Sequence, residues 1–99
     1  MPMSFLSRFR IKADKIADFV ALIPQIEAIS AEEPDTLGYK FYRLEEPGMF
    51  AVFESFTNAD ADVAHQQNPK LVGIIDDILA CMDGSYTREY LYDIEQVSA

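Results

Sequence analysis

The spacing of hydrophobic and polar positions changes along the chain, and each change marks the boundary of an expected element. Residues 3–11 alternate between two sides, with Phe5 and Phe9 on one of them, and this period of two predicts a half-buried strand. Over residues 12–33 the apolar positions recur at every third or fourth residue, which predicts an amphipathic helix. The helix should end there because Pro34 disfavours helical geometry in the residue before it.

Two further strands are predicted to form an antiparallel hairpin. Residues 37–44 alternate again, residues 45–48 (Glu-Glu-Pro-Gly) have the composition of a turn, and residues 49–57 are rich in aromatic residues. Both sides of the second of these strands are apolar, with Phe50, Val52 and Phe56 on one side and Met49, Ala51 and Phe53 on the other. Both faces of the resulting sheet therefore need a cover.

The second half of the chain predicts helical segments and a last strand. Asn58 is expected to cap a short helix through His65, and the Asn68-Pro69 pair is expected to open a second helical piece that stops near Gly84. Alternation over residues 86–94 predicts the fourth strand, and we expect the last five residues to form a loose tail.

The predicted order, β-α-β-β-α-β, is that of a ferredoxin-like α+β fold, an antiparallel sheet with two helices on one face. We expect a single domain over residues 1–99 with its core at about residues 3–94. Two helices cover only one face of such a sheet, so the other needs a different cover. A second copy of the chain would provide it, which predicts a homodimer, a dimeric α+β barrel with the helices outside.

Composition and charge exclude several classes of binding partner and indicate where the protein is located. The 99 residues are 49% hydrophobic, and 8 Lys and Arg against 17 Asp and Glu give a net charge of -9, which repels nucleic acid and anionic lipid. No apolar run approaches the roughly 18 residues of a membrane span, and the start of the chain lacks the pattern of an export signal. Cys81 is the only cysteine, so we expect no disulfide within the chain and a cytoplasmic location.

Three short segments resemble a known family. They are Leu37-Gly38-Tyr39-Lys40-Phe41-Tyr42-Arg43, Phe53-Glu54-Ser55-Phe56-Thr57-Asn58 and Ala64-His65-Gln66-Gln67-Asn68-Pro69. Together, over residues 3–94, the chain resembles the antibiotic biosynthesis monooxygenase family of dimeric α+β barrels. The resemblance implies a homodimer whose ligand pocket lies between the sheet and the helices of each subunit. Some members oxidise polycyclic phenols or quinols with O₂ and without metal or flavin, and others degrade haem.

The chain departs from the family pattern at two places, one of them near Lys70, where the helix motif of the family often carries a second His or an aromatic residue. Phe56 stands where the strand motif commonly carries Trp, and the chain contains no Trp at all. The haem-degrading branch relies on a Trp together with an Asn and an axial His, so we do not expect haem degradation here. Stress-responsive, isomerase and dehalogenating proteins share this fold plan, and fold alone does not fix function.

His65 is the only histidine of the chain, so a metal site with two histidines is excluded and no metal or other cofactor is expected. The resemblance aligns His65 with the family's histidine, which makes it the candidate catalytic base that accepts a proton from a phenol. In the alternative interpretation His65 has a structural role, capping the end of its helix or packing under the Asn68-Pro69 turn.

Glu54 is the second candidate catalytic residue because it is a carboxylate on an apolar side of a strand. It could orient His65 or bind a substrate hydroxyl. It could equally form an ion pair with Arg8, Arg43 or Arg88, and this structural interpretation is the one we favour, because charged residues on strands more often face a partner than a substrate.

Aromatic residues suit a flat apolar ligand, and we expect Tyr39, Phe53, Phe56 and Tyr86 to bind it, although for each alone a place in the core or at the dimer interface is the stronger interpretation.

The acidic pairs and the single cysteine are expected to have structural roles and no catalytic ones. The acidic pairs Glu32-Glu33, Glu45-Glu46 and Asp76-Asp77 are expected to be solvated surface, and Cys81 a small buried hydrophobic residue.

The leading functional hypothesis is therefore a cofactor-independent monooxygenase that acts on small aromatic, phenolic or quinol substrates with O₂. The alternative is a non-catalytic dimeric protein of the same fold that binds a ligand or responds to stress. A second polar group beside His65 at the pocket would favour the enzyme.

Overall fold

The computed structural model describes residues 2–96, which fold into a four-stranded sheet and three α-helices. These elements, with two short 3₁₀ turns, are β1 (Met3–Arg10), η1 (Ala13–Lys15), α1 (Ile16–Glu32), β2 (Thr36–Arg43), β3 (Met49–Phe56), α2 (Ala59–Gln67), α3 (Val72–Cys81), β4 (Thr87–Leu91) and η2 (Ile94–Gln96).

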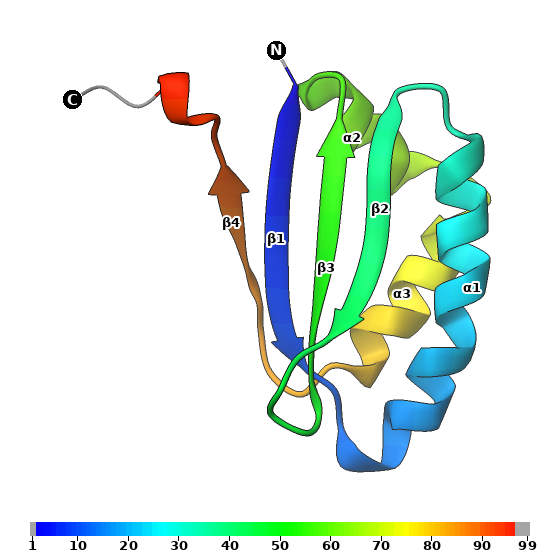
Figure 1. Ribbon diagram of the computed structural model, residues 1–99. Helices are drawn as coiled ribbons and strands as arrows, with labels where there is room; N and C mark the ends of the chain where they lie inside the picture. Colours follow the sequence, from blue (N-terminus) through cyan, green and yellow to red (C-terminus); the bar gives the residue numbers. More distant parts are fainter. Residues whose placement is uncertain (1, 97–99) are drawn as a thin grey trace.

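The strands lie in the order β2-β3-β1-β4, and every neighbouring pair is antiparallel. Figure 1 shows the helices gathered on one face of the sheet, with β4 at the edge farthest from α1. The ferredoxin-like α+β prediction is confirmed, and the second helical region consists of two pieces, α2 and α3, as predicted.

The predicted first helix is confirmed, but it begins with the 3₁₀ turn η1 and becomes α-helical only at Ile16. It continues through Pro24 and ends at Glu32. Glu33 has the extended backbone that a residue before proline prefers, and its N–H still donates to the carbonyl of Ser30.

Asn58 caps α2 as predicted, because its Oδ1 accepts a hydrogen bond from the N–H of Ala61 at 2.9 Å. The prediction that Asn68-Pro69 opens the next helical piece is confirmed in part: Asn68 Oδ1 accepts a hydrogen bond from the N–H of Lys70 at 3.0 Å, but the α-helix itself begins only at Val72. Asn68 closes α2, its N–H donating to the carbonyl of His65, and a turn leads to α3, which begins at Val72. Asn68 Nδ2 also donates a hydrogen bond to the Glu33 carboxylate at 2.9 Å, a contact that no local sequence pattern predicts.

The fourth strand is shorter than predicted. It pairs with β1 only from Thr87 to Leu91, where Leu91 is opposite Ser4 near the start of β1. Only Met3 of β1 lies beyond that point, and the chain leaves the sheet there and forms η2. Part of the predicted loose tail, residues 97–99, lies outside the described residues.

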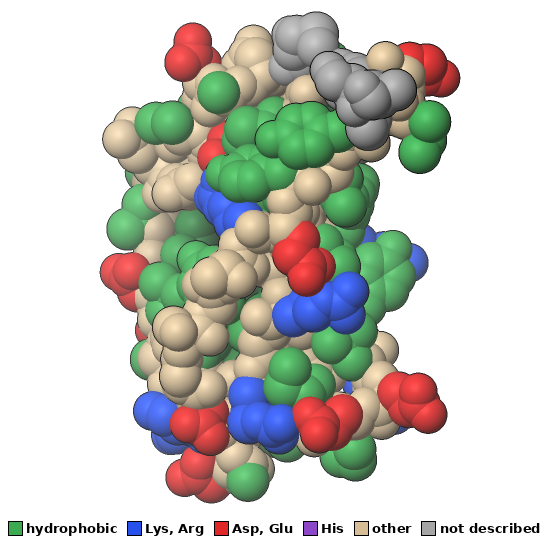
Figure 2. All heavy atoms as spheres, turned by 90° about the vertical axis from the view of Figure 1, so that its left-hand side faces the viewer, with side chains coloured by type: hydrophobic (Ala, Val, Ile, Leu, Met, Phe, Trp, Pro, Cys, Tyr) green, Lys and Arg blue, Asp and Glu red, His purple; other side chains and the backbone are tan. Residues whose placement is uncertain are grey.

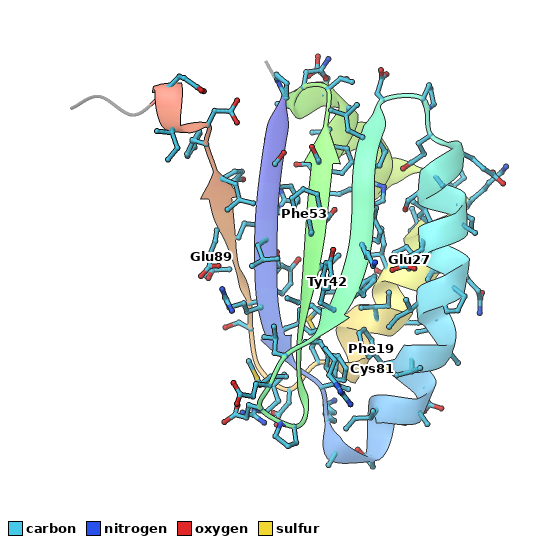
Figure 3. All side chains as sticks on the ribbon, in the orientation of Figure 1. Phe19, Glu27, Tyr42, Phe53, Cys81 and Glu89 are labelled. Atoms are coloured by element: carbon cyan, nitrogen blue, oxygen red, sulfur yellow. The ribbon has the colours of Figure 1, made fainter. Side chains whose placement is uncertain are left out.

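Four phenylalanines form the centre of the main core between the sheet and α1. Phe9 from β1, Phe19 from α1, Phe41 from β2 and Phe50 from β3 are buried, and we call them the aromatic core. The ring of Phe19 lies edge-on to the other three, with centroids 4.9–5.7 Å away. Figure 3 shows Phe19 and the buried Cys81 on the helix side of the sheet, as expected for an apolar packing role.

The other face of the sheet carries no helix and mixes apolar and polar side chains. Phe53 lies there, against Gly38, where an added Cβ would come within 3.2 Å of its ring. Arg8 and Glu89 form an ion pair of 3.2 Å across β1 and β4. Figure 2, which views the molecule from the side of β4, shows hydrophobic side chains interspersed with acidic and basic ones.

Hydrophobic side chains near the C-terminus also remain exposed, among them Leu91, Tyr92 and Ile94. In the described part of the chain, no helix combines the length and the apolar character that crossing a membrane requires.

Candidate functional site

A cavity of about 200 Å³ lies between the helix-facing side of the sheet and helices α2 and α3. One part of its wall is apolar and includes Phe9, Phe41, Val52, Ile75, Ile78 and Met82. The other part carries the polar side chains of Ser7, Tyr39, Glu54, His65, Gln66, Tyr86 and Arg88. Alternate residues of a strand share a face, so Glu54 follows Val52 of β3 into the wall, and Arg88 follows Tyr86 near β4.

His65 lies in the last turn of α2 and is buried, with 3% of its side chain exposed. Two aromatic rings pack against its ring, with 5.0 Å between the centroids of His65 and Tyr39 and 5.4 Å between those of His65 and Phe56. These contacts hold the imidazole at the cavity wall. The structure thus places His65 at a cavity, and within residues 2–96 the imidazole makes no capping hydrogen bond to its helix.

Glu33 binds the inner nitrogen of His65, with 2.7 Å between Oε1 and Nδ1. Two further groups hold the carboxylate in place: Asn68 Nδ2 donates to it at 2.9 Å, and so does Thr36 Oγ1. Burial alone would raise the pKa of the Glu33 carboxyl, but the hydrogen bonds from His65, Asn68 and Thr36 outweigh it and hold the pKa below its usual value. The expectation that Glu33 is solvated surface is therefore wrong.

This contact fixes the chemistry of the imidazole. A carboxylate only accepts hydrogen bonds, so Nδ1 must carry the proton that it shares with Glu33. In the neutral ring the other nitrogen, Nε2, is then unprotonated, and it faces Glu54 at the cavity. A carboxylate bound to one nitrogen of a histidine both orients the ring and stabilises the imidazolium that forms when Nε2 takes a proton.

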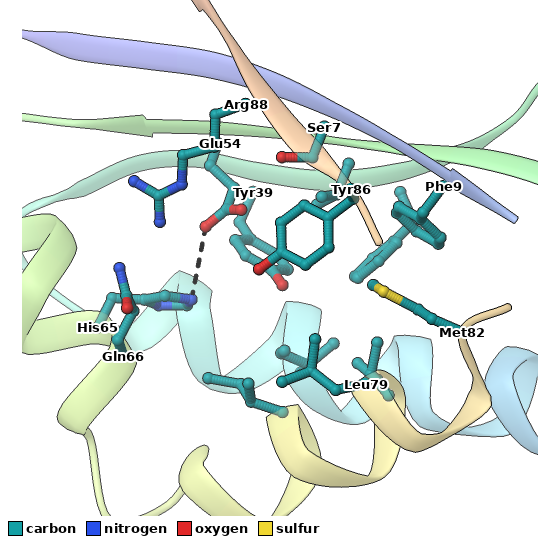
Figure 4. Close-up of a pocket in the computed structure, with 15 residues that line it drawn as sticks. Ser7, Phe9, Tyr39, Glu54, His65, Gln66, Leu79, Met82, Tyr86 and Arg88 are labelled. Carbon is teal, nitrogen blue, oxygen red and sulfur yellow. Dashed lines mark ion pairs between the residues drawn. The ribbon is translucent and has the colours of Figure 1, made fainter. Parts of the chain in front are cut away.

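Glu54 faces His65 across the cavity wall, with 3.8 Å between Oε1 and Nε2, too long for a direct hydrogen bond (Figure 4). Burial raises the pKa of Glu54 to about 7; the positive charge of Arg88 opposes this shift, whereas Asp62 and Glu33 add to it. Near neutral pH the carboxyl is therefore present in both protonation states. It can donate or accept a hydrogen bond to a ligand oxygen.

The ion pair that we favoured for Glu54 is not formed. Within residues 2–96, no ion pair joins Glu54 to an arginine; Arg88 instead binds both oxygens of Asp62, at 2.7 Å and 3.2 Å. The guanidinium also lies over the ring of Phe5, 4.0 Å from its centroid. Arg88 thus contributes a fixed positive charge near the cavity and leaves Glu54 free for another role.

Both predicted ligand-binding tyrosines line the cavity: Tyr39 from β2 and Tyr86 just before β4. Burial raises the pKa of the Tyr39 phenol well above its ordinary value, and the nearby carboxylates of Glu54 and Glu27 raise it further. The Tyr39 hydroxyl therefore stays protonated. Tyr86 is half-exposed, which places it at the border of the cavity with solvent.

The two predicted ligand-binding phenylalanines do not line the cavity. Phe53 pairs with Leu6 and Lys40 on the opposite face of the sheet, because it is an odd number of residues from the cavity residues Val52 and Glu54. Phe56 shares the correct face but is fully buried between Phe5 and His65. Its ring packs against the imidazole instead of the cavity.

Sequence reasoning missed Glu33 and Asp62, the two carboxylates that hold the cavity's charged groups. Asp62 precedes His65 by three residues, so the periodicity of a helix already places the two on one side of α2. No comparable signal marks Glu33, because its burial depends on residues of α2 that are distant in sequence.

The arrangement supplies a proton acceptor, His65 Nε2, and a carboxyl that titrates near neutral pH in one largely apolar cavity. Among residues 2–96, no group of three or more His, Cys, Asp or Glu side chains is placed to hold a metal ion. Proton transfer to and from a bound ligand is the chemistry that these residues can perform on their own.

Solved structures with the same fold come from several bacteria. Rv0793 from Mycobacterium tuberculosis matches with a TM-score of 0.85 at 17% identity, covering 99% of this chain and 100% of that one. PA3566 from Pseudomonas aeruginosa has a TM-score of 0.81 at 15% identity and covers 94% of each chain. A variant of SnoaB, a cofactor-independent oxygenase from Streptomyces nogalater, has a TM-score of 0.77 at 14% identity, covering 99% of this chain and 98% of that one.

At these identities the structural likeness shows the fold alone. No curated protein sequence matches the chain significantly. The sequence profile of the family described as antibiotic biosynthesis monooxygenase matches residues 3–75, well over half of the chain, and includes Glu33, Glu54 and His65. The chain belongs to the antibiotic biosynthesis monooxygenase family.

Proposed function

We propose that this protein is a cofactor-independent monooxygenase that acts on small aromatic, phenolic or quinol substrates with O₂. The observation that carries the proposal is the Glu33-His65 pair, which leaves Nε2 of a buried imidazole unprotonated at an apolar cavity. The family, and the similarity in fold to SnoaB, a cofactor-independent oxygenase, support the same reaction class.

In the proposed reaction His65 Nε2 accepts the proton of a substrate hydroxyl. Glu33 stabilises the imidazolium, so the proton transfer does not leave an isolated positive charge in the cavity. Glu54 and the Tyr39 hydroxyl line the same wall and can hydrogen-bond the substrate oxygens. The electron-rich anion then transfers its own electrons to O₂: one oxygen atom enters the ring and the other leaves as water, so that a phenol becomes a quinone and a quinol a hydroxyquinone without an external reductant. The apolar wall limits access of water to the reactive species.

One observation favours the alternative, a protein that binds an aromatic ligand without converting it. When His65 is protonated and Glu54 is ionised, the two side chains form an ion pair of 3.8 Å. In that state Nε2 holds a proton and cannot act as a base, so the cavity is only a binding site.

We propose that two copies of the chain pack their helix-free sheet faces together. The support is the one-sided arrangement of the helices, which leaves Phe53 on a face without a cover (Figure 3). Leu6, directly opposite Phe53 on β1, lies on the same face. The single thiol of Cys81 is buried and free, which suits a reducing compartment such as the cytoplasm.

The dimer is tested with a charge placed on the uncovered face. Phe53→Asp should convert a dimer into monomers or unfold it, because the interface would bury an ion without a partner. Val20→Asp is the matched control, since Val20 is 48% exposed on α1. Light scattering of the wild type at the mass of one chain, or an unchanged dimer in the Phe53 variant, would contradict the proposal.

The reaction is tested with His65→Ala and an oxygen electrode, using a panel of small quinols and phenols. Loss of a positioned base should lower oxygen consumption by roughly 10²- to 10⁴-fold while ligand binding changes far less. Gln67→Ala, at an exposed position at the end of α2, is the control. Unchanged turnover in the His65 variant together with a lower melting temperature would assign His65 a structural role. Tight binding of a panel member by the wild type without oxygen consumption would favour the binding protein.

A further inference from the structure

Ser7 is a polar residue in an otherwise apolar row on β1. On the helix-facing side of this strand its neighbours are Phe5 and Phe9, both almost completely buried. Ser7 itself is only 2% exposed, its hydroxyl has no hydrogen-bond partner, and it lines the cavity. Figure 4 shows it on the same wall as Glu54.

An unpaired buried hydroxyl is unfavourable, so this one calls for a partner in the cavity, either an ordered water or an oxygen atom of a ligand that replaces the water. In a strand the backbone carbonyls point along the sheet toward neighbouring strands, away from the side chain. The Ser7 hydroxyl therefore has to find its partner on the helix-facing side of the sheet, where the cavity is.

Ser30 provides an internal comparison. It is also fully buried with an unpaired hydroxyl, but it lies on α1 and does not line the cavity. A helical serine can turn its hydroxyl to a carbonyl of the preceding turn, so Ser30 needs no ligand. The two serines share burial and differ in access to the cavity.

The sheet register fixes where Ser7 lies relative to the polar groups of the site. Ser7 is directly opposite Val52 on β3, and Glu54 is two residues farther along that strand on the same face. Such diagonal neighbours lie roughly 7–8 Å apart between Cα atoms. One aromatic ring with oxygens on opposite carbons is of a size to bridge side chains at this spacing.

We propose that the Ser7 hydroxyl is a second polar anchor of the cavity and that the ligand is an aromatic ring with two oxygen substituents. One oxygen lies at His65 and Glu54, and the other forms a hydrogen bond with Ser7. The first half of this statement rests on the proposed function, and the second adds a residue that selects diols or hydroxyquinones over simple phenols.

The test measures binding without oxygen, so that turnover does not enter. Naphthohydroquinone, with two hydroxyls on opposite carbons, and α-naphthol, with one, are titrated anaerobically into the wild type, Ser7→Ala and Ser30→Ala. Ser7→Ala should weaken binding of the diol by about five- to tenfold and that of the naphthol by less than about twofold, the effect of one neutral hydrogen bond. Ser30→Ala should change neither affinity.

Each other outcome has a defined meaning. Equal losses of affinity for both ligands would show that Ser7 only shapes the cavity. An unchanged affinity for both would show that its hydroxyl does not contact the ligand. Either result overturns the proposal. If the wild type binds neither probe, the ligand class is wrong. If the Ser7 pattern appears but the wild type consumes no oxygen with the diol, the anchor stands and the monooxygenase proposal fails.

Discussion

The aromatic core and the polar end of the cavity occupy the same layer between the sheet and the helices, yet their composition is opposite. The core brings together Phe9, Phe19, Phe41 and Phe50, whose rings lie edge-on or stacked. A few residues farther along the same strands, the layer holds Glu54, Ser7 and Tyr39. The first region can stabilise the fold, whereas the second keeps ionisable and hydroxyl groups away from water.

The difference shows how the site is held in place. On β3 the helix-facing positions run from Phe50 through Val52 to Glu54, so the carboxylate is attached to a strand that the core has already fixed. The imidazole is instead fixed by Glu33 and by the rings of Tyr39 and Phe56. Core packing therefore positions Glu54, whereas His65 is positioned by its hydrogen bond to Glu33 together with the packing of two aromatic rings.

The largest expected effect lies in the aromatic core. Phe19→Ala should lower the free energy of unfolding by about 3–5 kcal/mol, because it removes a buried ring and leaves a cavity among the other three phenylalanines. Urea denaturation measures it, and Val20→Ala, at the neighbouring exposed position, should cost less than about 1 kcal/mol. Similar losses at both positions would contradict the assignment of stability to this core.

The second effect concerns Glu54→Gln. It is smaller and of opposite sign, because this substitution should raise the free energy of unfolding relative to the wild type as the pH rises. The pKa of Glu54 is raised from 4.5 to about 7 on folding, so the folded protein binds this proton more tightly than the unfolded chain does. The resulting stability is fully present below pH 4.5 and is lost as the pH rises to about 7. Glu54→Gln does not titrate, so relative to the wild type it should gain roughly 1–3 kcal/mol between acidic and mildly alkaline pH.

Denaturation curves over this pH range measure the difference. Glu33 acts in the other direction, because its pKa is lowered and its contribution is lost as the pH falls through that lowered value. A constant stability difference between wild type and the Glu54 variant at every pH would show that Glu54 has an ordinary, solvated carboxyl.

The alternation of strand residues predicted which side chains share one side of each strand, but not which side faces the helices. It placed Phe9 with Phe5 and Glu54 with Phe50, whereas His65 was identified as a candidate base from the resemblance to the family. Phe53 was assigned to the ligand although its own alternation put it on the opposite face. When both faces of a sheet are apolar, an aromatic side chain does not by itself indicate which face lines the cavity.

Glu33 and Ser7 could not be predicted because their roles arise only from tertiary contacts. Glu33 is at a helix end beside the exposed Glu32, and the two differ only in that Glu33 meets His65 and Asn68 of another element. Ser7 fits the alternation of β1 as well as any small residue would. Its missing hydrogen-bond partner becomes visible only when its surroundings are known.

The central claim, that Glu33 holds the proton of His65 on Nδ1 and leaves Nε2 free at the cavity, can be observed directly. His65 is the only histidine in the chain, so a long-range ¹H–¹⁵N spectrum of untagged protein reports this ring without ambiguity. We predict a protonated Nδ1 and an unprotonated Nε2 in the neutral ring, a preference that Glu33→Gln should weaken and that Glu32→Gln, at the exposed neighbour, should leave intact. A neutral ring protonated on Nε2, or a tautomer that is the same in all three proteins, would contradict the account.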